Sequence, residues 1–237
     1  MIRRVQVYGQ RCSGTNALIK LIEANFPELA FTEEYGFKHW LVPEWVSLPS
    51  DVLALVIVRR PNQWLRSLHR NPWHADCDLK KLHFSNFIRA PWERVWNDDF
   101  WGVSPNRDFY HTPIIEERCP STGRPFANAI AKRTAKLKNW IAVAQQAGAH
   151  AFVSHETLVS NPRSILDKIA NAAGVARRDN WTYLTSYKGA GETPFVLTMY
   201  ESLSRADREH VAQYLDETVE RQFADPIEPI MEMRKCL

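Results

Sequence analysis

The sequence predicts an α/β fold with a central parallel sheet between two layers of helices. Residues 52–58, VLALVIV, form a continuous apolar and largely β-branched run, which is typical of a parallel strand buried on both faces. Strand-like and helix-like segments alternate around this run, as they do in sheets built with helical crossovers. The 237 residues fit a single α/β domain spanning 1–237.

The first part of the chain supplies the first strands and helices of this sheet. Residues 5–8 predict a strand, and residues 16–26 place their apolar side chains on one helical face. The aromatic-rich segment 35–41 predicts a second strand. After the strand 52–58, Pro61 is well placed as the first residue of a helix that continues to residue 70.

Residues 71–125 interrupt this alternation. Prolines punctuate the segment, and it is rich in aromatic residues, including Trp73, Trp92, Trp96 and Trp101. We expect an inserted, mostly helical lobe with a short helix of its own over 84–96. Its tryptophans either form the core of the lobe or offer flat faces to the sugar rings of a substrate.

The last third of the chain returns to alternating elements. A long helix is expected over about 127–147, with Gly148 as its cap. A strand over 149–158 and an amphipathic helix over 160–175, ended by Gly174, follow it.

Two further features of this part of the chain carry predictions. Ser204 with Asp207 resembles a capping box that opens a helix over 205–223. Basic residues of the long helix are expected to form a solvated face, with a contact to an acidic acceptor as the alternative: Lys132, Arg133, Lys136 and Lys138.

Composition and charge narrow the function classes. The net charge of +3 suits an anionic ligand, but the chain lacks the blocks of Lys and Arg expected of a nucleic-acid binder. No apolar run approaches the roughly 18 residues of a membrane-spanning helix. The N-terminus shows no signal-peptide pattern, so we expect a cytoplasmic protein without an integral membrane segment.

The cysteines and histidines predict neither disulfides nor a metal. The four cysteines have no paired spacing, which favours free thiols: Cys12, Cys77, Cys119 and Cys236. Soft ligands cluster after the second helix, but their spacing matches none of the usual zinc patterns: His69, His74, Cys77 and His83.

The loop after the first strand, GQRCSGTN, resembles a phosphate-binding loop with two letters changed. Gly9 and Gly14 stand five residues apart, as the glycines of G-x-x-x-x-G-K-[ST] do. Thr15 replaces the lysine of that motif and Asn16 its magnesium-binding hydroxyl. Such a turn presents backbone N–H groups to an anion at a helix N-terminus, and Arg11 and nearby hydroxyls add donors. A plain tight turn is the alternative.

A second anion-binding element follows the buried strand. Arg59 stands at the carboxyl end of the strand, which is the edge where open α/β sheets bind ligands. Ser67 lies eight residues further on, in the following helix. One Arg and one hydroxyl at this edge could anchor a second phosphate, because each charge-assisted hydrogen bond contributes about 1.5–3 kcal/mol.

With these segments in view, the chain resembles the PAPS-dependent sulfotransferases, which transfer a sulfuryl group from 3′-phosphoadenosine 5′-phosphosulfate. RCSGTN is similar to their 5′-phosphosulfate loop, VRRPNQWLRS to their 3′-phosphate segment, and FKHWLVP to their Lys-Thr-His-Leu-Pro strand. SHETLVSNPRSILDKIANAAGV and YKGAG resemble two later family segments. The matches occur in family order and span about residues 5–191.

The resemblance implies a P-loop NTPase-like three-layer fold and a site for PAPS that needs no metal. The loop residues would hold the 5′-phosphosulfate: Gly9, Arg11, Cys12, Ser13, Gly14, Thr15 and Asn16. Arg59 and Ser67 would bind the 3′-phosphate, and Lys188 with Gly189 would close over it. His39 would act as the general base, Arg11 would stabilise charge on the bridging oxygen, and Lys38 is a second candidate for charge stabilisation.

The sequence departs from the family pattern at three places. Cys12 is an extra residue between the basic residue and Ser13 of the loop. Lys38 and His39 are adjacent, where the family spaces them by one residue, and adjacent residues of a strand point to opposite faces. Tyr187 replaces an arginine in the late loop.

Two alternatives to a sulfotransferase stay open at this point. One is another P-loop transferase, such as a small-molecule kinase, and the other is a non-catalytic nucleotide-binding module with this fold. For the sulfotransferase we expect a small molecule or a glycan as acceptor, and the lobe's aromatic residues favour a carbohydrate or a glycolipid. A glycolipid acceptor would bring peripheral contact with a membrane.

Overall fold

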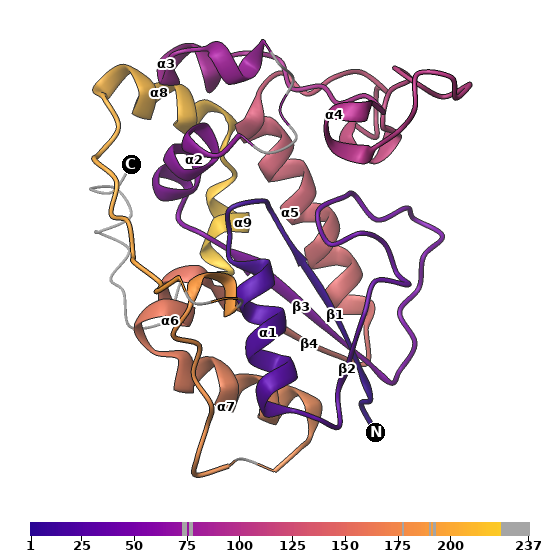
Figure 1. Cartoon of the computed structure of the whole chain (residues 1–237), viewed down its shortest axis with the longest axis vertical. Coiled ribbons are helices and arrows are strands. Elements are labelled where there is room, and N and C mark those ends of the chain that lie inside the picture. The colour runs from indigo at the N-terminus through magenta and orange to yellow at the C-terminus, as the bar shows by residue number, and fades with distance from the viewer. Residues whose placement is uncertain (73–74, 76–77, 177, 190, 192, 224–237) are drawn as a thin grey trace.

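The computed structural model describes residues 1–72, 75, 78–176, 178–189, 191 and 193–223, without the side chains of residues 99, 100 and 188. Within these residues four strands form one all-parallel sheet, in the order β2-β1-β3-β4 (Figure 1). The strands are β1 (Arg4–Gly9), β2 (Ala30–Thr32), β3 (Val52–Val58) and β4 (Ala149–Ser154). The predicted α/β class with a central parallel sheet is confirmed.

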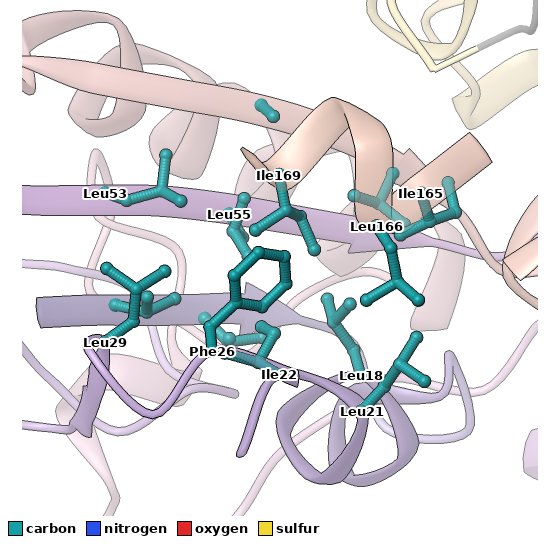
Figure 2. Packing of buried hydrophobic residues seen from close by; sticks show 14 of the residues in the cluster. Leu18, Leu21, Ile22, Phe26, Leu29, Leu53, Leu55, Ile165, Leu166 and Ile169 are labelled. Carbon is teal, nitrogen blue, oxygen red and sulfur yellow. The ribbon is translucent and has the colours of Figure 1, made fainter. Parts of the chain in front are cut away.

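Helices cover both faces of this sheet. Because side chains of a strand alternate between faces, Leu53, Leu55 and Ile57 of β3 pack with α1 (Thr15–Asn25) and α7 (Pro162–Ala173). Figure 2 shows this cluster, in which Leu18, Ile22 and Ile169 meet the leucines of β3.

The residues of β3 between these three form the opposite face. Val52, Ala54, Val56 and Val58 pack with α5 (Ala129–Gln146) and α9 (Glu217–Arg221). All seven residues of β3 are buried, as a strand between two helical layers requires.

Several predicted element ends are confirmed with their local causes. Pro61 is the first residue of α2 (Pro61–Arg70). Gly174 ends α7 in the left-handed conformation, with φ of 66°. The Ser204 side chain accepts a hydrogen bond from the Asp207 N–H at the start of α8 (Arg205–Tyr214).

The predicted second strand over 35–41 is wrong. The paired strand is β2, at residues 30–32, and the segment 35–41 forms turns and irregular backbone. Its rings pack sideways on the inserted lobe: Phe37 contacts Trp101, and Trp40 contacts both Trp96 and Trp101 at ring-centroid distances of 5.4–6.0 Å. The aromatic composition therefore reflects packing against the lobe and not sheet formation.

The inserted lobe is less helical than predicted. Helix 84–96 is confined to α3 (Phe84–Phe87), and the other described helical pieces are α4 (Asp98–Trp101) and the 3₁₀ turns η1 (Leu79–Lys81) and η2 (Ile115–Glu117). Pro91 cannot continue a helix, and it follows α3 closely. A third core, to which Trp92 and Phe87 belong, joins the lobe to α2 and α8.

Three further boundaries differ from expectation. Gly148 does not cap α5 in the left-handed conformation; it lets the backbone pass Ser50, whose carbonyl oxygen would lie 2.9 Å from an added Cβ. Strand 149–158 ends at Ser154, whose side chain caps α6 (His155–Ser160). The helix over 205–223 divides into α8 and α9, because Asp216 caps a new helix. Among the described residues, no helix has both the length and the apolar character to cross a membrane.

Candidate anion-binding site

A cavity of about 680 Å³ opens at the carboxyl edge of the sheet. Its walls include residues that directly follow three strands: the loop after β1, Arg59 after β3 and His155 after β4. The structure brings most predicted site residues to this cavity: Arg11, Cys12, Gly14, Thr15, Asn16, Lys38, His39, Arg59 and Ser67. The position matches the edge at which open α/β sheets bind ligands.

Three predicted residues are not part of the described wall of the cavity, and for a fourth the structure describes no side chain. Gly9 and Ser13 are buried within the loop, and the Ser13 hydroxyl has no hydrogen-bond partner among the described residues. Gly189 ends the 3₁₀ turn η3 (Tyr187–Gly189) and packs on Lys20 and Leu184. The side chain of Lys188 lies outside the described residues, although the neighbouring Tyr187 lines the cavity.

The charged side chains in the described wall of the cavity are all cationic. Arg11, Lys38, Arg59 and Arg70 line it, whereas no Asp or Glu occurs among the described residues of the wall. Backbone amides and the hydroxyls of Thr15 and other residues add neutral donors. This wall is therefore suited to a ligand with several negative charges.

The loop after β1 is shaped by close contacts and positive φ angles. A Cβ on Gly9 would lie 2.7 Å from Ile57, and a Cβ on Gly14 would lie 2.8 Å from His155. Gly14 has φ of 88°, which favours glycine. Cys12, the extra residue of the loop, also adopts a left-handed conformation, with φ of 66°. The loop thus accommodates Cys12, its extra residue, by making a sharp local turn.

Arg59 carries a buried guanidinium whose hydrogen bonds, among the described residues, go to backbone carbonyls. Its Nη1 donates to the Cys12 carbonyl and its Nη2 to the Thr198 carbonyl, both at 3.5 Å, and the group lies 5.6 Å from the Tyr200 ring centroid. Its Nε is buried without a hydrogen-bond partner among the described residues. These hydrogen bonds are long and their acceptors are uncharged, so the Arg59 guanidinium can still form strong, charge-assisted hydrogen bonds with an anion.

Arg133 of α5 holds the backbone of Arg59 at the edge of the cavity. Its guanidinium is fully buried, pairs with Glu220 at 2.7 Å, and donates to the Gln10 side chain and the Arg59 carbonyl. The prediction that the basic residues of this helix form a solvated face is therefore wrong for Lys132, Arg133 and Lys136, which are all buried. It holds for Lys138, which is exposed. Nothing in their spacing distinguishes a buried basic stripe from an exposed one.

His39 lines the cavity, and one of its two ring nitrogens forms a hydrogen bond with the backbone. Its Nδ1 lies 2.6 Å from the Gly9 carbonyl oxygen, which only accepts hydrogen bonds. Nδ1 is therefore the protonated nitrogen of the neutral ring, and Nε2 keeps its lone pair. Burial, and then the positive charges of Arg11 and Lys38, hold the pKa of His39 well below its usual range, so the ring is neutral at pH 7.

The side chain of Arg11 lies in the cavity wall. Because Cys12 is an extra residue in the loop, the sequence alone did not determine this orientation. Its guanidinium lies 5.7 Å from the Phe37 ring centroid and interacts electrostatically with Glu117 and Arg94. Burial, followed by the charge of Arg94, lowers the pKa of Arg11 to about 9, against the opposing effect of Glu117. Arg11 still carries its charge at pH 7.

Side chains of α5 satisfy the backbone of residues 39–42. Lys136 Nζ donates to the His39 carbonyl at 2.5 Å, and Trp140 Nε1 donates to the Trp40 carbonyl at 2.7 Å. Asn139 both donates to the Val42 carbonyl and accepts from the Val42 N–H. These bonds replace the ladder that a strand would have made, and they fix the position of His39.

Glu117 of the inserted lobe anchors this arrangement. It is buried and forms ion pairs with Lys132 at 2.8 Å and Lys136 at 2.6 Å. Burial alone would raise the pKa of Glu117, but the two ammonium groups hold it at about 2. Sequence reasoning missed this residue, because its partners lie 15 and 19 positions further along the chain.

Two further parts of the wall were also missed. His155, at the start of α6, is buried against Gly14, and burial, followed by the charge of Arg59, lowers its pKa to about 4. The segment 195–200 crosses the cavity and is tied to α2, where the Gln63 side chain donates to the Tyr200 carbonyl and accepts from its N–H, both at 3.0 Å.

The described residues contain no group of three or more His, Cys, Asp or Glu side chains placed to hold a metal ion. Of the soft ligands after α2, His69 contacts the Leu82 carbonyl through Nε2 at 2.9 Å. His74 and Cys77 lie outside the described residues. Comparison with known proteins adds no family: no family model matches the chain, and no curated protein matches its sequence.

The ion pairs of Glu117 predict a specific acid sensitivity. Its pKa is about 2 in the folded state against 4.5 for the free group, so ionised Glu117 stabilises the fold above pH 4.5 by about 3 kcal/mol. This contribution is lost as the pH falls from 4.5 toward 2. Urea unfolding at pH 5 and pH 3 measures it.

Glu117→Gln is expected to reduce the difference in unfolding free energy between these two pH values. Glu209→Gln is the matched control, because Glu209 is exposed and pairs only with Arg205 one helical turn away. An identical acid dependence in wild type and Glu117→Gln would contradict the assignment.

Proposed function

We propose that this chain is a sulfotransferase, which transfers a sulfuryl group from PAPS to a hydroxyl group of an acceptor on a P-loop-type fold. The observation that carries the proposal is the wall of the cavity, whose charged side chains are all cationic among the described residues, with Arg11 in the loop and Arg59 after β3. PAPS carries a 5′-phosphosulfate and a 3′-phosphate. Two separate anionic groups therefore match two arginines, of which Arg11 is half-buried and Arg59 is buried.

The residues of the cavity fit such a ligand. The loop amides from Arg11 to Thr15, at the N-terminus of α1, would hold the 5′-phosphosulfate. Arg59 and Ser67, one after β3 and one on α2, would hold the 3′-phosphate. The unpartnered Nε of Arg59 supports this role, because a buried donor requires an acceptor.

Bound PAPS supplies the sulfuryl group for transfer, and the residues around His39 fit the proton transfer. His39 Nε2 accepts the proton of the acceptor hydroxyl as that oxygen bonds to sulfur and the sulfur–oxygen bond to the phosphate breaks. The electron pair of the broken bond stays on the phosphate oxygen. Arg11 would stabilise that charge in a buried setting, where fixed positive groups act most strongly. Lys38 pairs with Glu33 at 3.0 Å, which favours Arg11 for this role.

The acceptor is proposed to be a small molecule or glycan that approaches past the aromatic residues beside His39. The Phe37 ring lies 5.2 Å from the His39 ring, and Trp40, Trp96 and Trp101 pack around it in a half-buried cluster. Flat apolar faces next to a proton acceptor suit the rings of a carbohydrate or glycolipid. Trp92, in contrast, is core.

Two alternative functions make different predictions. A small-molecule kinase would need groups that bind magnesium and the β- and γ-phosphates, and Thr15 and Asn16 occupy the positions of those groups in the usual motif. A non-catalytic nucleotide-binding module would not need the oriented lone pair of His39 Nε2. The cavity and His39 together favour the sulfotransferase.

Transfer of labelled sulfate from PAPS tests the proposal. Purified protein, PAPS carrying labelled sulfate, and an extract of acceptors are expected to give a labelled product only when all three are present. The same protein with labelled ATP and magnesium is expected to label nothing. Phosphate transfer without sulfate transfer would support the kinase, and nucleotide binding without any transfer would support the binding module.

A further inference from the structure

We infer that Lys136 and Glu117 position His39, so that the inserted lobe controls the geometry of the proton acceptor. This inference rests on the proposed function for its kinetic consequence, but its structural consequence stands apart from it. Neither residue lines the cavity among the described residues, so neither contacts a ligand there directly. Lys136 touches His39, whereas Glu117 acts on His39 through Lys136 and also interacts electrostatically with Arg11.

The contacts form one short, buried chain. Glu117 Oε1 accepts from Lys136 Nζ at 2.6 Å, and the same Nζ donates to the His39 carbonyl at 2.5 Å. On the other side of His39, Nδ1 donates to the Gly9 carbonyl at 2.6 Å. Lys136 of α5, which is paired with Glu117 of the lobe, therefore holds the backbone of His39. Gly9 at the end of β1 holds its ring.

A second contact from the same turn of the lobe supports the inference. The Leu41 N–H donates to the Glu116 carbonyl at 3.1 Å, two residues after His39. The 3₁₀ turn η2 thus touches the His39 segment directly through Glu116 and indirectly through Glu117. The segment forms no strand, and besides the Gly9 N–H bond to the Lys38 carbonyl its backbone next to His39 is held by these contacts, so a displacement of the lobe would shift the His39 carbonyl.

Lys132 supplies a matched control for Lys136. Both lysines lie on α5, one helical turn apart, and both are buried and paired with Glu117. Only Lys136 also touches His39; Lys132 lies 4.0 Å from the Trp92 ring centroid instead. Lys136→Met and Lys132→Met each leave Glu117 with one ammonium partner, so they remove the same charge and differ in the contact to His39.

The kinetic test compares these two variants. Lys136→Met is expected to lower kcat by about 100-fold, the size of effect that a displacement of a reacting group by about 1 Å produces. The affinity for the product 3′,5′-diphosphoadenosine (PAP) is expected to stay within about threefold. Lys132→Met is expected to keep kcat within about threefold. Equal losses in both variants, or no loss in Lys136→Met, would overturn the inference.

Nitrogen-15 NMR of labelled histidine gives a readout that needs no substrate. In the wild type, His39 is expected to show the Nδ1-protonated tautomer alone; in Lys136→Met the signal is expected to shift toward a mixture, and in Lys132→Met to stay unchanged. If Lys136→Met does not fold, Glu117→Gln with Lys132→Met weakens the same anchor without changing the net charge. An unaltered His39 signal in the folded anchor variant would contradict the inference. A shift in a protein that transfers no sulfate would support the inference and reject the proposed function.

Discussion

Replacing Arg59 with Ala is expected to weaken the binding of PAP by about 100-fold or more. Arg59 is the buried cation after β3, and its guanidinium donates two 3.5 Å hydrogen bonds to carbonyls and lies near one aromatic ring. A charge-assisted hydrogen bond contributes about 1.5–3 kcal/mol, and the planar guanidinium offers two to one phosphate. Isothermal titration calorimetry with PAP measures the change.

Two variants control this experiment. Arg60→Ala removes the same charge from the next residue, which does not line the cavity, and is expected to bind PAP as the wild type does. Arg59→Lys keeps the charge but loses the planar fork, so an intermediate affinity is expected. An Arg59→Ala variant that binds PAP as tightly as Arg60→Ala would remove the phosphate role of Arg59.

Replacing His39 with Asn is expected to lower kcat by about 1000-fold, within the range that general bases contribute. Asn keeps a donor near the position of Nδ1 for the Gly9 carbonyl but has no basic nitrogen, so the fold and PAP binding are expected to persist. Single-turnover transfer from PAPS separates this loss from any change in binding. Turnover close to that of the wild type would exclude His39 as the base.

The pH profile gives a second test of His39. Because the pKa of His39 lies well below its usual range, its neutral form persists as the pH falls through 7 and 6. The plot of kcat/KM against pH is therefore expected to stay flat across the usual histidine range and to decline only at lower pH. A decline centred near pH 6.5 would mean that His39 is less buried than the structure shows or is not the base.

Several predictions that came from local chemistry were confirmed by the structure. The run 52–58 is β3 to the residue, because seven apolar β-formers leave no competing element. Pro61 and Gly174 mark helix ends, because their backbone preferences are intrinsic to the residue. The carboxyl edge of the sheet brings the loop residues and Arg59 together, which follows from parallel strands alone.

Two failures, the strand over 35–41 and the solvated face of α5, share one physical cause, which is long-range side-chain partners. The segment 35–41 has strand-like composition, but its His39 and Trp40 carbonyls accept hydrogen bonds from Lys136 and Trp140, about 100 residues away. The basic residues of α5 resemble a solvated face until Glu117 and Glu220 are placed beside them. A single sequence carries no record of such pairings, so neither the position of His39 nor its anchor could be predicted.

Calorimetric titration of the wild-type protein tests the central proposal most directly, because it asks which anion the cavity accepts. The proposal predicts PAP binding with a Kd of about micromolar or below, without added metal, and much weaker binding of ATP with magnesium. Binding of ATP with magnesium in preference to PAP, or the absence of binding by either nucleotide, would contradict it.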